Sequence, residues 1–195
     1  TAGATGPDIL FASNTSTLPI SGLAEHWPRP DNFIGLHFFS PVQRMALVEV
    51  IRGRQTSDTC LAQALDFVAR IGKRPVVVND SRGFFTSRVF STYFEEGMAL
   101  LAEGVAPALI ENAGRQTGMP LGPLAVADEV ALDLVHKIIV QTRADLGPSY
   151  TPPVSAPVIE LFVEKLGRVG KKAGKGFYDY ADGQRRLWPG LAEHF

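Results

Sequence analysis

The sequence predicts an α/β segment followed by an all-α segment. Short apolar runs alternate with helical and turn segments over residues 1–80, whereas apolar positions recur every three or four residues after Asn79-Asp80-Ser81. This change of period predicts two domains, 1–80 and 81–195. The sequence contains no internal repeat and no low-complexity tract.

Strands and one crossing helix are predicted in the first segment. Four compact apolar runs, each bounded by Pro, Asn, Asp or Gly, are typical of strands, and they cover 8–13, 33–39, 47–51 and 75–79. Between the last two runs, apolar residues recur at helical spacing from Asp58 to Gly72, where a glycine stop follows. A shorter helix-like segment, 18–27, follows the first strand.

The second segment is predicted to be helical throughout. Prolines mark the starts of two helices, glycines mark the ends of two, and a proline-rich connector precedes the last one. We predict helices at 83–103, 107–118, 123–138 and 158–166.

Composition and charge exclude several classes of protein. The 195 residues are 45% hydrophobic and 20% charged, as in a folded globular protein, and the net charge of -1 gives no general attraction for nucleic acid or an anionic membrane. The single cysteine, Cys60, has no His or Cys at metal-ligand spacing, so we expect no disulfide, no zinc site and a reducing, cytoplasmic setting. Residues 1–6 lack an initiator Met and signal-peptide features, which suggests the middle of a longer protein.

His37 stands out among the histidines because it lies inside an apolar run, directly before two phenylalanines and a Ser-Pro turn signal. If 33–39 and 47–53 form a hairpin, the numbers of facing residues sum to about 86, which places Glu49 opposite His37. A carboxylate there would fix the imidazole tautomer and stabilise its protonated form, as a general base requires. Taken alone, the pair also fits a buried structural hydrogen bond.

A polar loop follows the first predicted strand. Ligands of open α/β sheets bind at carboxyl strand ends, and Asn14, Thr15 and Ser16 could offer hydrogen bonds there. Asn14 and Ser16 are therefore candidate cofactor-binding residues. Ser16 could also simply cap the following helix.

Six sequence blocks occur in the order and spacing found in L-3-hydroxyacyl-CoA dehydrogenases. They span roughly residues 8–180 and are FASNTS, GLHFFSPV, LVEVI, KRPVVVNDSRGFF, GMPLGP and GKKAGKGFYDY. The chain resembles this family, and its tail, 185–195, resembles the form within the alpha subunit of bacterial multifunctional fatty-acid oxidation complexes. The resemblance implies the last strands of a Rossmann-like NAD-binding sheet, followed by the family's helical C-terminal domain.

The resemblance also implies an activity and a role for each matched residue. The reaction would be NAD-dependent oxidation of 3-hydroxyacyl-CoA to 3-oxoacyl-CoA in fatty-acid β-oxidation. His37 would be the catalytic base, Glu49 its orienting partner, and Ser16 a contact to both substrate and cofactor. Lys172 matches a lysine that reaches towards the cofactor, although by itself it reads as a solvated charge at a turn.

Two positions depart from the family pattern. The family usually has Asn where this chain has Ser40, beside the cofactor, and Asn where it has Ser87, which holds the 3-oxygen of the substrate. Serine offers one short hydroxyl in place of an amide. At both the catalytic position Ser87 and the cofactor position Ser40, a hydroxyl therefore takes the place of the amide that the family uses.

No Gly-x-Gly-x-x-Gly occurs in the sequence, although the family begins with that phosphate-binding turn. We therefore expect the chain to be a fragment that is inactive alone and binds NADH weakly or not at all. Two alternatives remain: a non-catalytic helical association module of a multifunctional protein, and a dehydrogenase for another 3-hydroxy acid. Expected partners are an acyl-CoA substrate and, through the helical domain, a second copy or a larger β-oxidation complex, without nucleic acid or membrane.

Overall fold

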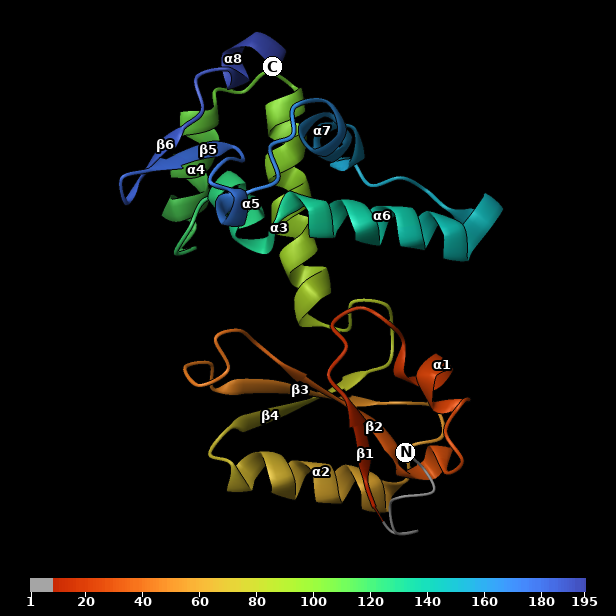
Figure 1. The fold of residues 1–195 in the computed structure, drawn as a ribbon. Helices are drawn as coiled ribbons and strands as arrows, with labels where there is room; N and C mark the ends of the chain where they lie inside the picture. The colour runs from red at the N-terminus through yellow and green to blue at the C-terminus, as the bar shows by residue number, and fades with distance from the viewer. Residues whose placement is uncertain (1–8) are drawn as a thin grey trace. The chain divides into compact units, whose positions relative to one another are not determined.

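The computed structural model describes residues 9–195, so residue 8 of the first predicted strand and the segment 1–6 lie outside the described residues. The chain forms two compact units, Thr1–Val89 and Phe90–Phe195, and most residues contact other residues of their own unit (Figure 1). The division falls inside helix α3 (Thr86–Ala102), whose first turn belongs to the first unit.

A four-stranded mixed sheet forms the centre of the first unit. The order is β1-β2-β3-β4, with β1 parallel to β2, β2 antiparallel to β3 and β3 parallel to β4. All four predicted strands are confirmed, at β1 (Phe11–Ser13), β2 (Phe33–Phe38), β3 (Leu47–Arg52) and β4 (Arg74–Asn79). The other elements of this unit are α1 (Ile20–Ala24), η2 (Pro30–Asn32) and α2 (Asp58–Arg70).

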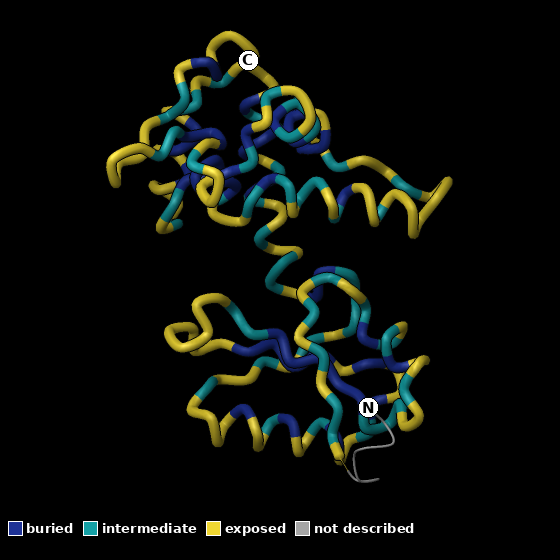
Figure 2. Tube along the Cα trace, viewed as in Figure 1, coloured by how far each residue is buried: buried dark blue, intermediate teal, exposed yellow. Residues whose placement is uncertain are grey.

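The two faces of this sheet carry different cores, because successive side chains of a strand point to opposite sides. One face packs on α2, and its cluster consists of Ile34, Leu36, Val48, Val50, Cys60, Ala64 and Val68. The other face packs on α1 and on the segment before α3, and its cluster consists of Ile20, Ala24, Phe33, Ile51 and Phe84. The central strands are accordingly buried in Figure 2. By the same alternation, His37 and Glu49 lie on the face away from α2.

Gly35 allows α1 to approach the sheet closely. A Cβ atom at this position would lie 2.8 Å from the Ile20 side chain of α1 and 2.9 Å from Ile51 Cβ. No larger residue fits without moving the helix. Gly35, the first residue of the GLHFFSPV block, thus allows close packing of α1 on the sheet near His37.

The second unit packs helices around one apolar cluster. It contains most of α3, then α4 (Pro107–Gln116), α5 (Pro123–Val130), α6 (Leu132–Leu146), η3 (Gly147–Ser149), α7 (Ala156–Glu160), η4 (Leu161–Lys165), η5 (Lys171–Ala173), β5 (Tyr178–Ala181), β6 (Gln184–Leu187) and α8 (Leu191–His194). No helix between residues 9 and 195 is both long and apolar enough to cross a bilayer.

The prediction of one continuous helix over 123–138 is wrong, because the structure has two helices there, α5 and α6. Ala131 has a φ of 77°, and the backbone N–H of Leu132 donates to the carbonyl of Val169 instead of to the preceding helical turn. Pairing with this distant segment ends α5 and starts α6 as a separate helix.

The prediction of an all-helical second segment is also corrected, because β5 and β6 form an antiparallel hairpin. Its turn residues Asp182 and Gly183 have φ values of 52° and 71°, as a two-residue hairpin turn requires. Asp128 accepts hydrogen bonds from the backbone N–H groups of Phe177 (2.8 Å) and Tyr178 (2.9 Å). The hairpin is therefore anchored on the helices by a buried carboxylate, which gives the GKGFYDY sequence a structural role.

Candidate active site

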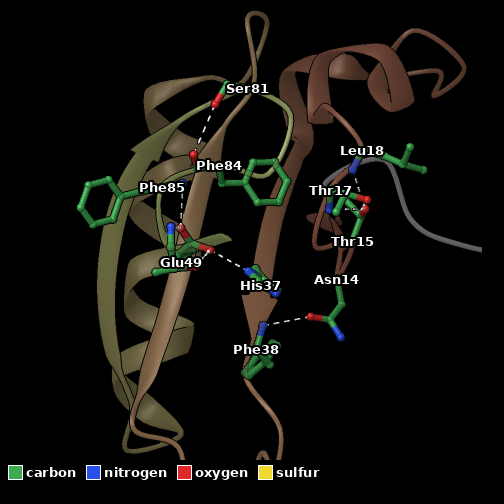
Figure 3. Close-up of polar contacts among 11 residues, drawn as sticks. Asn14, Thr15, Thr17, Leu18, His37, Phe38, Glu49, Ser81, Phe84 and Phe85 are labelled. Atoms are coloured by element: carbon green, nitrogen blue, oxygen red, sulfur yellow. Dashed lines mark hydrogen bonds and ion pairs between the residues drawn. The ribbon is translucent and has the colours of Figure 1, made fainter. Parts of the chain in front are cut away.

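His37 and Glu49 face each other across β2 and β3, as the hairpin argument predicts. His37 Nδ1 lies 2.6 Å from Glu49 Oε2, and the two side chains point toward one another in Figure 3. His37 is 7% exposed and Glu49 is fully buried. The pairing, its register and its hydrogen bond are thus confirmed.

Glu49 accepts three further hydrogen bonds from Phe85 and Thr86, at the point where the chain enters α3. Its Oε1 accepts from the backbone N–H groups of Phe85 (3.1 Å) and Thr86 (2.9 Å). Its Oε2, the oxygen that faces His37, accepts from the Thr86 hydroxyl at 2.8 Å. Each carboxylate oxygen therefore has two partners, which offsets the cost of burying the charge.

The turn before α3 aims these backbone donors at Glu49. Gly83 and Phe84 have φ values of 75° and 49°, and after this turn the backbone N–H groups of Phe85 and Thr86 both lie within hydrogen-bond distance of Glu49 Oε1. The first N–H groups of a helix lack intrahelical partners, and the helix dipole favours negative charge there. Glu49 supplies that charge from the sheet.

The surroundings of Glu49 favour its ionised form. Burial opposes ionisation, but the hydrogen bonds from Thr86, His37 and Phe85 outweigh it and hold the pKa of Glu49 below its usual 4.5. An ionised carboxylate only accepts hydrogen bonds. The Nδ1 atom of His37 therefore carries a proton and donates a hydrogen bond to Glu49. In the neutral imidazole, Nε2 is then the nitrogen with a free lone pair.

Aromatic rings pack around His37. The ring centroid of Phe39 lies 4.5 Å from that of His37, and the centroid of Phe84 lies 6.1 Å away. Phe84 is 2% exposed and comes from the same turn that binds Glu49. These contacts restrict the imidazole to one orientation.

Asn14 lies beside the dyad at the carboxyl ends of the parallel strands β1 and β2. Its Oδ1 accepts a hydrogen bond from the backbone N–H of Phe38 at 2.9 Å (Figure 3). Thr15 Oγ1 accepts from the Leu18 N–H at 3.0 Å and so closes the polar loop. Ser16 is exposed in this loop.

The alternative role of Ser16 as a helix cap is corrected. Helix α1 begins at Ile20, and the two oxygens of Asp80 accept from the backbone N–H groups of Ile20 and Ser21, each at 2.8 Å. A carboxylate from the end of β4 thus caps the helix. Ser16 is left available for other contacts.

The capping role of Asp80 leads to a stability prediction. Replacing Asp80 with Ala should lower the free energy of unfolding by about 1–2 kcal/mol, because two N–H groups at the start of α1 lose their acceptor. Urea denaturation measures this change. Asp66→Ala, at an exposed position of α2, is the control and should change stability by less than about 0.5 kcal/mol. Equal effects of the two substitutions would show that the cap contributes nothing.

The remaining matched residues lie at three places. Ser40 is exposed in the bend after β2, and Ser87 is half-buried in the first turn of α3, next to Thr86. Lys172 is exposed within η5 of the second unit. The structure thus brings Asn14, His37 and Glu49 together in the first unit, whereas the contacts of Lys172 with a cofactor stay a prediction.

Sequence reasoning missed Thr86 as a member of the site. A threonine directly after Gly-Phe-Phe carries no motif of its own, and its partner lies 37 residues earlier on another element. Among residues 9–195, no group of three or more His, Cys, Asp or Glu side chains is placed to hold a metal ion.

Two family models match the chain in succession. The NAD-binding domain of 3-hydroxyacyl-CoA dehydrogenase matches residues 2–81, and the C-terminal domain of 3-hydroxyacyl-CoA dehydrogenase matches residues 83–180. The chain belongs to the 3-hydroxyacyl-CoA dehydrogenase family. The resemblance inferred from the six sequence blocks is thereby confirmed, and so is the fold class of a Rossmann-like sheet followed by the helical domain of the family.

Curated relatives and solved structures agree with this assignment. The fatty acid oxidation complex subunit alpha of Shewanella sp. (strain W3-18-1) is 41% identical over 183 residues, which is 93% of this chain but 25% of the relative. The chain therefore spans about a quarter of the length of the curated relatives it matches.

Among solved structures, (S)-3-hydroxybutyryl-CoA dehydrogenase from Ralstonia eutropha has a TM-score of 0.83 and 38% identity, with 93% of this chain and 64% of that chain covered. The 3-hydroxybutyryl-CoA dehydrogenase from Escherichia coli K12 has a TM-score of 0.80 and 32% identity, with 95% and 39% covered.

Proposed function

We propose that these residues form the catalytic part of an NAD-dependent 3-hydroxyacyl-CoA dehydrogenase, with His37 as general base. The observation that supports this most strongly is the buried hydrogen bond of 2.6 Å between His37 Nδ1 and Glu49 Oε2. A neutral imidazole fixed in this way presents a basic Nε2.

The dyad performs the proton half of the reaction. His37 Nε2 takes the proton of the 3-hydroxyl group as the C3–H bond breaks, so that the C–O bond becomes a carbonyl. NAD, when bound, supplies the acceptor for the hydride from C3. The charge of Glu49 stabilises the imidazolium formed at His37, and the rings of Phe39 and Phe84 hold the imidazole in place.

The residues beside the dyad fit a nicotinamide cofactor. The carboxyl ends of β1 and β2 lie at one edge of the sheet, where open α/β sheets bind their ligands, and His37 lies near that edge. Asn14 and Ser16 offer amide and hydroxyl groups there, and we assign them to cofactor contacts, Ser16 also to the substrate. The roles of Ser40 and Lys172 at the cofactor and of Ser87 at the 3-oxygen belong to the same proposal.

We further propose an acyl-CoA thioester as substrate, assembly into a larger complex, and a cytoplasmic location. The printed names of the relatives support the first two points: two solved neighbours are 3-hydroxybutyryl-CoA dehydrogenases, and the curated relatives are subunits of fatty acid oxidation complexes. The single buried cysteine, Cys60, is compatible with a reducing compartment.

The test of this function is a comparison of substrates. The enzyme that contains these 195 residues is incubated with NAD and either an (S)-3-hydroxyacyl-CoA or the matching free 3-hydroxy acid. We expect one NADH per 3-oxoacyl-CoA formed and far slower turnover of the free acid. Preferential oxidation of the free acid would favour the alternative of a dehydrogenase for another 3-hydroxy acid. No oxidation of either would favour the association module.

A further inference from the structure

Thr86 contacts Glu49 twice, through two different atoms. Its backbone N–H binds Oε1 at 2.9 Å, and its hydroxyl binds Oε2 at 2.8 Å. A helix cap requires only the backbone contact. The hydroxyl contact is additional, and it involves the same oxygen that accepts from His37 Nδ1.

We propose that Thr86 is a positioning residue that sets the basicity of His37 by sharing Glu49 Oε2 with it. This inference rests on the proposed function of the dyad and extends it to a residue outside the dyad. Two donors on one carboxylate oxygen divide its negative charge. The hydroxyl of Thr86 therefore weakens the hydrogen bond that stabilises the imidazolium form of His37.

A weaker stabilisation of the imidazolium form of His37 suits a general base. A general base must be neutral before it accepts a proton, so its pKa has to lie near the working pH. A fully buried carboxylate with His37 as the only donor on Oε2 would favour the imidazolium strongly and leave less neutral base. Thr86 limits this effect while Phe85 and the helix start keep the carboxylate in place.

The groups around the imidazole allow this effect to be isolated. Glu49 approaches His37 from β3, Phe39 from the end of β2 and Phe84 from the turn before α3. Glu49 is the one ionisable group among these three contacts. A change in the titration of His37 on substitution of Thr86 would therefore act through Glu49.

The experiment is an NMR titration of labelled histidine in the 195-residue chain, with the His37 signal assigned by its loss in His37→Gln. Thr86→Val and Thr86→Ala both keep the backbone N–H and remove the hydroxyl. We expect the pKa of His37 to rise in each of these variants and to return to the wild-type value in Thr86→Ser. In the enzyme, the acidic limb of the profile of kcat/KM against pH should move upward by the same amount.

Thr56→Val is the matched control. Thr56 is a buried threonine of the first unit, and its hydroxyl donates to the carbonyl of Phe33 at 2.7 Å. It should lower stability and leave the titration of His37 unchanged. An unchanged or lowered pKa of His37 in both Thr86→Val and Thr86→Ala would overturn the inference. Because the titration needs no turnover, this outcome is distinguishable from a failure of the proposed oxidation.

Discussion

Replacing His37 with Gln is expected to lower kcat/KM for oxidation of a 3-hydroxyacyl-CoA about 10²–10⁴-fold. Glutamine has no group that takes a proton near neutral pH, but its amide can still donate to Glu49 and fill much of the space of the imidazole. The loss should therefore appear in kcat, with KM little changed. Initial rates of NADH formation in the enzyme that contains these residues measure both constants.

His26→Gln provides the control for this substitution. His26 is an exposed histidine of the same unit whose Nδ1 lies 3.4 Å from the carbonyl oxygen of Gly22. Its replacement should leave kcat/KM close to the wild-type value. If the His37 variant kept wild-type turnover, His37 would be a structural residue and the buried His–Glu hydrogen bond would need no catalytic explanation.

Glu49→Gln is expected to have the second largest effect, a loss of about 10²-fold or more at neutral pH. All four groups around the carboxylate are donors, so a glutamine amide must turn its NH₂ group toward one pair of them. If the NH₂ faces His37, Nδ1 becomes an acceptor and the proton moves to Nε2, which removes the base. If it faces Phe85 and Thr86, the start of α3 loses its acceptor.

Glu49→Gln should also change how the free energy of unfolding depends on pH. The pKa of Glu49 is lowered in the folded protein, so its contribution to stability is fully present above about pH 4.5 and is lost as the pH falls through the lowered value. The difference in unfolding free energy between wild type and Glu49→Gln should therefore shrink in acid. Glu25→Gln, at an exposed position, should leave both stability and activity at the wild-type level.

The first unit could be predicted in detail because its strands follow a simple rule. Side chains alternate strictly between the two faces, so the hairpin register followed from the positions of its two apolar runs, and the pairing of His37 with Glu49 followed from the register. The family blocks then supplied the chemical meaning of the pair. Neither step required knowledge of how the rest of the chain packs.

The features that escaped prediction depend on contacts between distant segments. The break at Ala131 follows from pairing of Leu132 with Val169, and the cap of α1 comes from Asp80, far along the chain. Apolar spacing carries no information about such partners. The hairpin at 178–187 did leave a local signal, since Asp182-Gly183 is a favoured two-residue turn.

In the proposed active site, Glu49 holds a proton on Nδ1 of His37 and leaves Nε2 free to act as a base. The ¹⁵N chemical shifts of His37 in the 195-residue chain, recorded at a pH where the imidazole is neutral, test this arrangement. We predict a neutral ring protonated at Nδ1, with Nε2 unprotonated. A neutral ring protonated at Nε2 would contradict the assignment of His37 as the base, because its only lone pair would then be on Nδ1, which faces Glu49 and not the substrate.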